Sequence, residues 1–319
     1  MPTNRNDNID SVKYWLMFLV IVGHVFAQGQ FSNSPECTVI WHWIYMFHMP
    51  LFIFISGYFS RKKDNKHFIS SCWKLIEPLV VYQIIIRSYE FFTAGTISLT
   101  EILTPWWILW YLLSLFYWRL MIQVIPNKIL ENKKVIIIST FIISLCAGFL
   151  PFNRFLSVQR TLAFMPFFFL GYCMRGKNMF IATKYRIWSA LFLVLTTILP
   201  IFFSKHLGDL NQAAPYGNPI VICSRMLVFG LSIPMSIAFI NICPNTPWIA
   251  KQGKMTMQYY IYHALIIFIL MKVVTKFGLP TTFLSAVIYT LLIVLCIPLL
   301  LKIPFIRKLT NPSSLLERQ

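Results

Sequence analysis

The sequence has few acidic residues and little charge of any kind. Only 12% of its 319 residues are charged, half of the roughly 25% found in soluble domains, and 10 Asp and Glu stand against 28 Lys and Arg. It also lacks a low-complexity linker, an internal repeat and any stretch that reads as a soluble domain. Together with an apolar content of 57%, these absences exclude a soluble globular protein and predict an integral membrane protein.

Several motifs of soluble enzymes are also missing. There is no G-x-S-x-G elbow, Walker loop, G-x-G-x-x-G turn, H-E-x-x-H helix or C-x-x-C pair. The seven cysteines lie mostly inside or beside apolar runs, which is typical of packing residues rather than of a disulfide framework. The sequence therefore predicts no metal site and no permanently bound cofactor.

Apolar runs of about 20 residues, each long enough to cross a ~30 Å hydrocarbon core, recur along the whole chain. We expect an all-α transmembrane helical bundle that forms a single domain, 1–319, with short tails at 1–12 and 304–319. Polar segments such as Lys205 to Asn218 separate the runs. About ten spans are predicted, near 13–28, 40–59, 75–93, 105–124, 135–150, 160–174, 187–203, 219–242, 257–274 and 283–303.

The basic residues give these spans an orientation. With a cytoplasmic N-terminus, twenty Lys and Arg fall in inside segments, five in outside segments and three within spans. This bias predicts that both termini are cytoplasmic, in a plasma membrane or bacterial inner membrane. The net charge of +18 then indicates contact with anionic lipid headgroups rather than with nucleic acid. Asp7, Asp10 and His24 argue against a cleaved signal peptide, so we expect the first helix to be retained.

The most informative polar pair is Lys13 and His24. Eleven residues come within 20° of three helical turns, so both side chains face the same way, about 16 Å apart along the axis. Asp10 precedes Lys13 by three residues and is expected either to pair with it or to cap the helix. Lys13 would place a cation at the cytoplasmic end of the helix, and His24 would place an imidazole deep in the bundle. This arrangement favours binding of an anionic ligand at the cytoplasmic side and a buried reaction centre in which His24 serves as general base.

The second span contains a helix-breaking proline. Pro50 is expected to kink the helix that carries His48, and Ser56 and Gly57 permit close contact with another helix. The cluster Arg61-Lys62-Lys63 follows at the cytoplasmic end, where it either holds phosphates or supplies ordinary positive-inside charge.

Other polar residues within the predicted spans are candidates for functional roles, because it costs free energy to place an ionisable group in hydrocarbon. Arg87 and Glu90 either pair at i,i+3 or, with outward-lying aromatic and basic residues, line a cavity for a polar acceptor. Structural pairing between helices is the competing interpretation for each of them. The remaining candidates are Trp110, Arg160 and Arg225 toward the outside, and Arg119 and His263 toward the inside.

Five segments stand in order along the chain: Asp10 to Lys13 with His24 eleven residues after Lys13, His48 to Tyr58, Leu109 to Leu112, Arg160 with Pro166 to Tyr172, and Tyr260 to His263. This ordered set of motifs resembles the acyltransferase-3 family of membrane acyltransferases, especially its fucose 4-O-acetylase-like branch. The resemblance covers nearly the whole chain, although Lys13 replaces the commoner Arg, and we expect no extracellular hydrolase-like domain of the kind that some members carry.

This resemblance implies transfer of an acyl group, usually acetyl from acetyl-CoA, to a hydroxyl of a glycan or lipid-linked sugar. His24 would act as general base or acyl carrier, with Asp10 as the second catalytic residue. The donor would be held by Lys13, Arg61, Lys62, Lys63, Arg119 and His263. The acceptor would meet His48, Arg87, Glu90, Trp110, Arg160 and Arg225. Membrane lipids are the other expected partners, and a homodimer is one arrangement considered.

Two other classes of function fit the residues alone. A transporter or flippase for an anionic or sugar-lipid substrate would use buried Arg, His and a kinked helix equally well, although it often shows inverted repeats. A non-catalytic scaffold would tolerate replacement of Lys13 and His24.

Overall fold

We describe the computed structural model of the chain over residues 7–152, 154–177, 183–203, 210, 215–216 and 219–310. These residues form helices and connecting turns, and no strand occurs among them. The predicted all-α class is therefore confirmed. The chain forms two compact units: unit 1 is 1–52, 178–210 and 224–310, and unit 2 is 53–177, 211–223 and 311–319.

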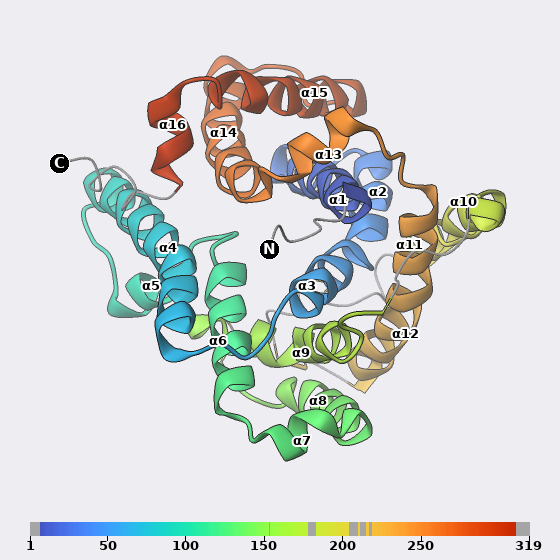
Figure 1. Cartoon of the computed structure of the whole chain (residues 1–319). Coiled ribbons are helices and arrows are strands. Elements are labelled where there is room, and N and C mark those ends of the chain that lie inside the picture. Colours follow the sequence, from blue (N-terminus) through green and yellow to red (C-terminus); the bar gives the residue numbers. More distant parts are fainter. Residues whose placement is uncertain are drawn as a thin grey trace. The chain divides into compact units, whose positions relative to one another are not determined.

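Unit 1 is built around its first helix, α1 (Asp7–Phe26), which packs against α2, α13, α14 and α15 (Figure 1). The other helices that lie mostly in this unit are α2 (Pro35–Tyr45), α10 (Arg186–Leu195), α11 (Ile198–Phe203), α12 (Pro219–Ile242), α13 (Pro247–Gly253), α14 (Thr256–Phe277), α15 (Phe283–Leu300) and α16 (Pro304–Leu309). Short 3₁₀ turns cover Gly29–Phe31 and Thr183–Tyr185.

Unit 2 centres on α6 and α9, with α4 packed on α6 and α8 packed on α9. Its helices are α4 (Asn65–Ala94), α5 (Leu99–Leu103), α6 (Trp110–Val124), α7 (Asn127–Glu131), α8 (Lys133–Ala147), the 3₁₀ turn η2 (Phe155–Ser157) and α9 (Val158–Cys173). Helix α3 (His48–Tyr58) contains the boundary between the units, which falls after Phe52.

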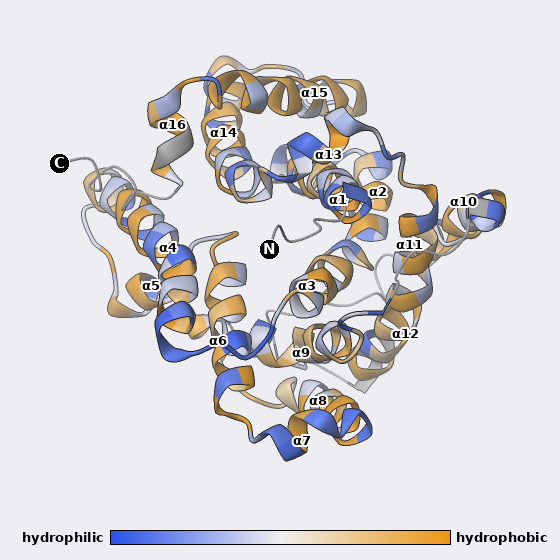
Figure 2. Ribbon diagram, in the orientation of Figure 1, coloured by the Kyte–Doolittle hydropathy of each residue, from blue (hydrophilic) through white to orange (hydrophobic). Residues whose placement is uncertain are grey.

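Among the described residues, six helical segments are long and apolar enough to cross a membrane. They are Asp7–Phe26, Pro35–Tyr58, Asn65–Ala94, Arg225–Ile242, Thr256–Phe277 and Phe283–Leu300. In Figure 2 the ribbon of α15 is coloured as hydrophobic over most of its length. Its Leu284, Leu291 and Leu295 are exposed. Exposed leucines on a long helix are expected where lipid replaces water as solvent.

Each of the ten predicted spans overlaps a helix, but α6, α8, α9 and the pair α10–α11 are shorter than the six long segments. The count of ten and the orientation of the termini stay predictions. The tails at 1–12 and 304–319 stay predictions, and helices occupy part of both. Residues 7–12 belong to α1, because Asp7 and Asp10 favour its first turn, and Pro304 begins α16. Residues 1–6 and 311–319, and most of Lys205 to Asn218, lie outside the described residues.

The helix break predicted near Pro50 is confirmed. Helix α2 ends at Tyr45, two residues form a turn, and α3 begins at His48, with Pro50 in its first turn. Proline has no backbone N–H, so it fits the first turn of a helix, whereas in the interior it removes a hydrogen bond and clashes with the carbonyl four residues before it. The break therefore falls just before Pro50, and it places Tyr45 and His48 on either side of the turn.

Candidate active site

The first turns of α1 carry a buried ion pair. The side chain of Asp10 is only 2% exposed, and its Oδ1 accepts a hydrogen bond from Lys13 Nζ at 2.7 Å. Three residues of helix bring the two side chains to one face. Lys13 keeps 21% of its side chain exposed. The predicted Asp10–Lys13 pairing is thus confirmed, so Lys13 has a carboxylate beside it in this structure.

A segment from the last third of the chain covers this pair. Gly253 of α13 packs so closely that a Cβ there would lie 1.8 Å from the carbonyl oxygen of Asp10. Ser11 Oγ donates to Asn245 Oδ1 at 2.7 Å, and Lys254 Nζ lies 3.1 Å from Asp7 Oδ1. The start of α1 is therefore fixed to the segment 245–254 by backbone contact, a hydrogen bond and an ion pair.

His24 lies three turns farther along α1, where α2 and α14 meet it. Its Nδ1 is 3.0 Å from the hydroxyl of Tyr45, and the His263 ring stacks beside it with centroids 5.4 Å apart and planes 23° apart. Gly23 allows this approach, because a Cβ at that position would lie 3.0 Å from the Tyr45 ring. The His24 side chain is half-buried, whereas Tyr45 is buried.

His48 joins the same group through Tyr45, with ring centroids 4.8 Å apart. We call His24, Tyr45, His48 and His263 the histidine cluster. His48 Nδ1 lies 2.7 Å from the Ile44 carbonyl oxygen and His263 Nδ1 lies 2.9 Å from that of Tyr259. Since a carbonyl only accepts, both rings carry their proton on Nδ1 and present a lone pair on Nε2. The His263 Nε2 is buried and has no hydrogen-bond partner within the described part of the chain.

Asp10 does not belong to the histidine cluster. Fourteen residues of continuous helix separate it from His24, or about 21 Å of rise, so the two catalytic candidates do not touch. The Asp10 carboxylate pairs with Lys13 instead.

Unit 2 contains a basic pocket of about 470 Å³. Arg61, Lys62 and Lys63 line it, and α4 adds further polar groups. A role of this cluster in holding phosphates stays a prediction. The side-chain amide of Gln123 holds the backbone of Lys63 from both sides, donating to its carbonyl at 2.8 Å and accepting from its N–H at 3.3 Å. The remaining lining residues are Asp64, His67, Ser70, Ser71 and Lys74.

The electrostatics of this basic pocket favour an anion. Burial, followed by the charges of Arg119, Arg61 and Lys74, lowers the pKa of Lys63 below its ordinary value. Arg119 Nη1 lies 3.4 Å from the Ser71 carbonyl oxygen. A bound anion would offset the repulsion among these cations, and several phosphate groups on one ligand would do so most strongly. Arg119 is thus near the predicted donor cluster.

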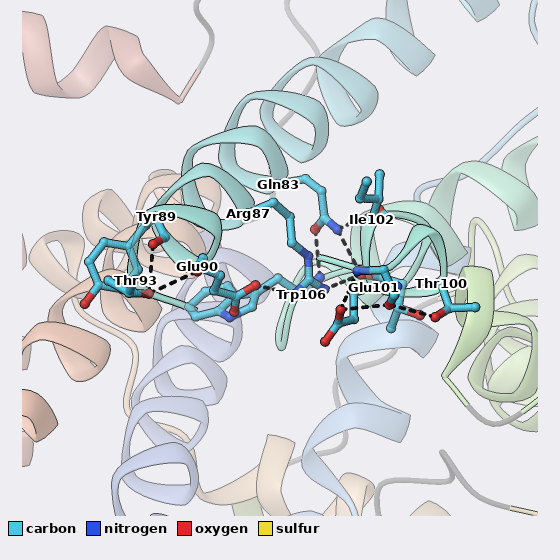
Figure 3. Close-up of polar contacts among 11 residues, drawn as sticks. Gln83, Arg87, Tyr89, Glu90, Thr93, Thr100, Glu101, Ile102 and Trp106 are labelled. Carbon is cyan, nitrogen blue, oxygen red and sulfur yellow. Dashed lines mark hydrogen bonds and ion pairs between the residues drawn. The ribbon is translucent and has the colours of Figure 1, made fainter. Parts of the chain in front are cut away.

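Arg87 and Glu90 form the ion pair predicted at i,i+3, and they share a network with Gln83 (Figure 3). Gln83 Nε2 donates to the carbonyls of Ile102 and Thr104, at 3.0 and 2.8 Å, and its Oε1 accepts from the Trp106 N–H at 2.8 Å. Arg87 Nη2 donates to the Thr104 carbonyl at 2.8 Å. These contacts fasten the segment between α5 and α6 to α4, which is a structural role, while a role in binding the acceptor stays a prediction.

Trp110 and Arg160 contact each other, and Arg225 belongs to the other unit. The Arg160 guanidinium carbon lies 5.0 Å from the Trp110 ring centroid, and Phe164 stacks on that ring at 5.6 Å. Arg225 is 3% exposed in α12. The Trp110 ring is therefore already in contact with protein groups. The predicted acceptor residues fall into both units, and no common acceptor site is shown.

A model of the acyltransferase-3 family, described as an acyltransferase domain, matches residues 6–302. The chain belongs to this acyltransferase family. The match contains α1 with the histidine cluster and the basic pocket with its lysines. The long apolar helices of the chain are those of an integral membrane protein.

Two relatives of this chain carry the name nodulation protein NolL. The one from Sinorhizobium fredii is 29% identical over 186 residues, which are 53% of this chain and 48% of that protein. The one from Mesorhizobium japonicum is 27% identical over 239 residues, which are 69% and 60%. The matches thus span between about half and three fifths of the relatives' lengths. No solved structure matches this chain.

The sequence does not reveal several residues that hold the candidate groups in place. Tyr45 was one of many aromatics in an apolar run, and nothing in the sequence places it at His24. Gln83, Gln123 and Gly253 act through contacts with residues 19 or more positions away, which spacing along one helix does not reveal. Lys74 lies on α4, eleven residues after Lys63. Its position on a helix was the one feature of the sequence that could have indicated that it lines the basic pocket.

Proposed function

We propose that this protein is an O-acetyltransferase that moves an acetyl group from acetyl-CoA to a hydroxyl of a glycan or lipid-linked sugar. The observation that carries the proposal is the position of His24, half-buried and held between Tyr45 and His263, in a chain that belongs to an acyltransferase family. We also propose that the protein belongs to the fucose 4-O-acetylase-like branch of the family. In this proposal it crosses the bacterial inner membrane ten times, with both termini in the cytoplasm.

The chemistry proposed for His24 is base catalysis at a hydroxyl. The acceptor oxygen attacks the thioester carbonyl carbon, the imidazole takes the hydroxyl proton, and the C–S bond breaks as the tetrahedral intermediate collapses. The proton then passes from His24 to the departing thiolate, which gives an ester and free CoA. If His24 instead carries the acyl group, the same imidazole nitrogen attacks the thioester first and the acceptor hydroxyl displaces it afterwards.

The basic pocket supports the choice of an acyl-CoA as donor. CoA carries a diphosphate and a 3′-phosphate, and a pocket with four Lys and Arg residues on its lining matches such an anion. Lys13 is a further proposed contact for the donor, since its side chain is partly exposed. We propose that His263 and Arg119 contribute to the donor side and His48 to the acceptor side.

The test compares purified wild type with His24→Ala in detergent. Binding of acetyl-CoA and its slow conversion to CoA are measured with and without a pool of candidate glycans. We expect both proteins to bind acetyl-CoA, and CoA release to fall on the order of 10²–10⁴-fold in His24→Ala, which is the usual contribution of a general base.

Thermal unfolding of both proteins provides the folding control. Equal CoA release by a folded His24→Ala would contradict the role given to His24. If folded wild type has no affinity for acetyl-CoA or longer acyl-CoAs, the donor assignment fails and the transporter alternative takes its place.

A further inference from the structure

Part of the basic pocket is lined by a segment that has no backbone pairing of its own. Residues 61–63 lie between α3 and α4 and belong to neither helix. Within the described part of the chain, their backbone groups form no hydrogen bond with other backbone groups. All three side chains are basic, and like charges repel each other, so the segment by itself favours arrangements that spread them apart. Holding them at one pocket therefore requires a contact from outside the segment.

Gln123 of α6 makes that contact. Its side-chain amide donates to the Lys63 carbonyl at 2.8 Å and accepts from the Lys63 N–H at 3.3 Å. These two bonds engage the peptide groups on both sides of Lys63, so they fix the orientation of the backbone as well as its position. Gln123 itself is not among the residues that line the pocket.

The same face of α6 also reaches the other side of the pocket. Arg119 lies one turn before Gln123, so the two side chains share a face of the helix. Arg119 Nη1 donates to the Ser71 carbonyl of α4 at 3.4 Å, and Ser71 lines the pocket. Helix α6 thus holds the segment 61–63 through Gln123 and contacts α4 through Arg119.

An amide suits this position because it bonds to the backbone without adding a charge. A carboxylate there would attract the cations of the pocket and compete with a bound anion. Asp64, the acidic residue that lines the pocket, is engaged at the start of α4: its Oδ1 accepts from the His67 N–H at 3.1 Å and its Oδ2 lies 2.7 Å from His67 Nδ1. Among the described residues, no carboxylate forms an ion pair with residues 61–63.

We propose that Gln123 is a positioning residue that holds the segment 61–63 so that its three basic side chains meet the phosphates of acetyl-CoA together. This inference rests on the proposed function, in which the basic pocket binds the acyl-CoA. Gln123 touches the backbone of Lys63 rather than the donor. Its contribution is to order the cations before binding, which lowers the entropic cost of forming the complex.

The first test is Gln123→Met, because Met keeps an unbranched side chain of similar length but has no N–H donor. With acetyl-CoA alone and water as the acceptor, we expect KM and Kd for acetyl-CoA to rise about threefold to thirtyfold, while kcat stays unchanged. S-acetylpantetheine, which lacks the phosphates, should bind equally to both proteins. A general loss of packing would instead weaken both donors.

Gln83→Met is the matched control. Gln83 also holds backbone of unit 2 through its side-chain amide, which donates to the Ile102 and Thr104 carbonyls and accepts from the Trp106 N–H. The segment that it holds does not line the basic pocket. Both substitutions are expected to lower the melting temperature, whereas Gln83→Met should keep the wild-type Kd for acetyl-CoA.

The second readout needs no ligand. Hydrogen–deuterium exchange reports whether the Lys63 N–H is protected by its bond to Gln123. We expect exchange at Lys63 to be about threefold to tenfold faster in Gln123→Met than in wild type, the usual effect of losing one hydrogen bond. Gln83→Met should exchange at the wild-type rate at this position.

Three results would overturn the inference: an unchanged Kd for acetyl-CoA in a folded Gln123→Met, an equal loss of affinity for S-acetylpantetheine, or equal exchange at Lys63 in Gln123→Met and wild type. Wild type that binds neither acetyl-CoA nor adenosine 3′,5′-bisphosphate would contradict the proposed donor instead. Exchange at Lys63 would then decide by itself whether Gln123 holds the segment.

Discussion

At the scale of single residues, ionisable side chains occur in two arrangements: an ion pair of opposite charges, and a group of like charges close together. Asp10 and Lys13 neutralise each other inside unit 1, whereas Lys63 lies among other cations in unit 2. The first arrangement followed from helical spacing, and the sequence analysis named it. The second depends on Arg119 of α6 and Lys74 of α4 lying near enough to Lys63 for their charges to act on it, and spacing along the chain does not show that.

The lowered pKa of Lys63 predicts a pH dependence of donor binding. The affinity for acetyl-CoA is expected to fall as the pH rises through this pKa, which lies below the usual value of about 10.4, because the ammonium loses its charge. Titration calorimetry at a series of pH values measures it. Lys63→Gln should bind less tightly at neutral pH and lose this slope, whereas Lys128→Gln, at an exposed position on α7, should keep it. Equal slopes in Lys63→Gln and wild type would contradict the assignment.

The same shift has a consequence for stability. Lys63 is charged less readily in the folded protein than in the unfolded chain, so between its lowered pKa and about 10.4 the unfolded state binds more protons. This group alone therefore makes the folded state more stable as the pH rises through that window. A bound anion should reduce the effect, since it favours the charged form.

At the scale of helices, two glycines determine how closely α3 and α9 approach. A Cβ on Gly57 would lie 1.9 Å from the Phe168 carbonyl oxygen, and one on Gly171 would lie 2.0 Å from that of Phe54. Each glycine thus faces the backbone of the other helix. Close contact at Gly57 was predicted from the small residues Ser56 and Gly57. The partner helix was not predicted, because a single sequence does not show which helices contact each other.

Gly57→Ala and Gly171→Ala are expected to destabilise unit 2 by about 1–3 kcal/mol or more, since the new methyl meets backbone that cannot move without separating the helices. Gly230→Ala is the matched control, because a Cβ there meets nothing within 4 Å in α12. It is expected to be neutral or stabilising by up to roughly 1 kcal/mol. Melting temperatures in detergent measure all three, and an unchanged value for Gly57→Ala would contradict the described packing.

At the scale of the whole molecule, hydrophobic runs predicted the helical class and the location of every long helix. The number of helices that cross the membrane is harder to obtain, because α6, α8 and α9 have 15, 15 and 16 residues. A helix of that length covers about 23 Å, less than a ~30 Å hydrocarbon core, unless flanking residues extend it. Burial against other helices and insertion into lipid favour the same apolar side chains, so composition does not separate the two.

Reporter fusions separate ten spans from six. Ten spans place the segment after α6 inside and the segment after α8 outside, so the two segments differ. We expect a fusion after Asn132 to fluoresce with a green fluorescent protein reporter and to lack alkaline phosphatase activity. A fusion after Phe152 should give the reverse. The same pattern at both positions would mean that α8 does not cross the membrane and that the count of ten is wrong.

The attachment of α1 to the segment 245–254 also constrains the order of events during synthesis. Ser11 and its partner Asn245 are 234 residues apart in the chain. At about 5–20 residues per second, roughly 12–47 s of translation separate them. The helix that carries His24 is therefore made first but completes its packing late, and until then Asp10 lacks the cover of Gly253. Truncations that stop before α13 should leave α1 available to membrane chaperones and proteases, whatever the state of the helices between.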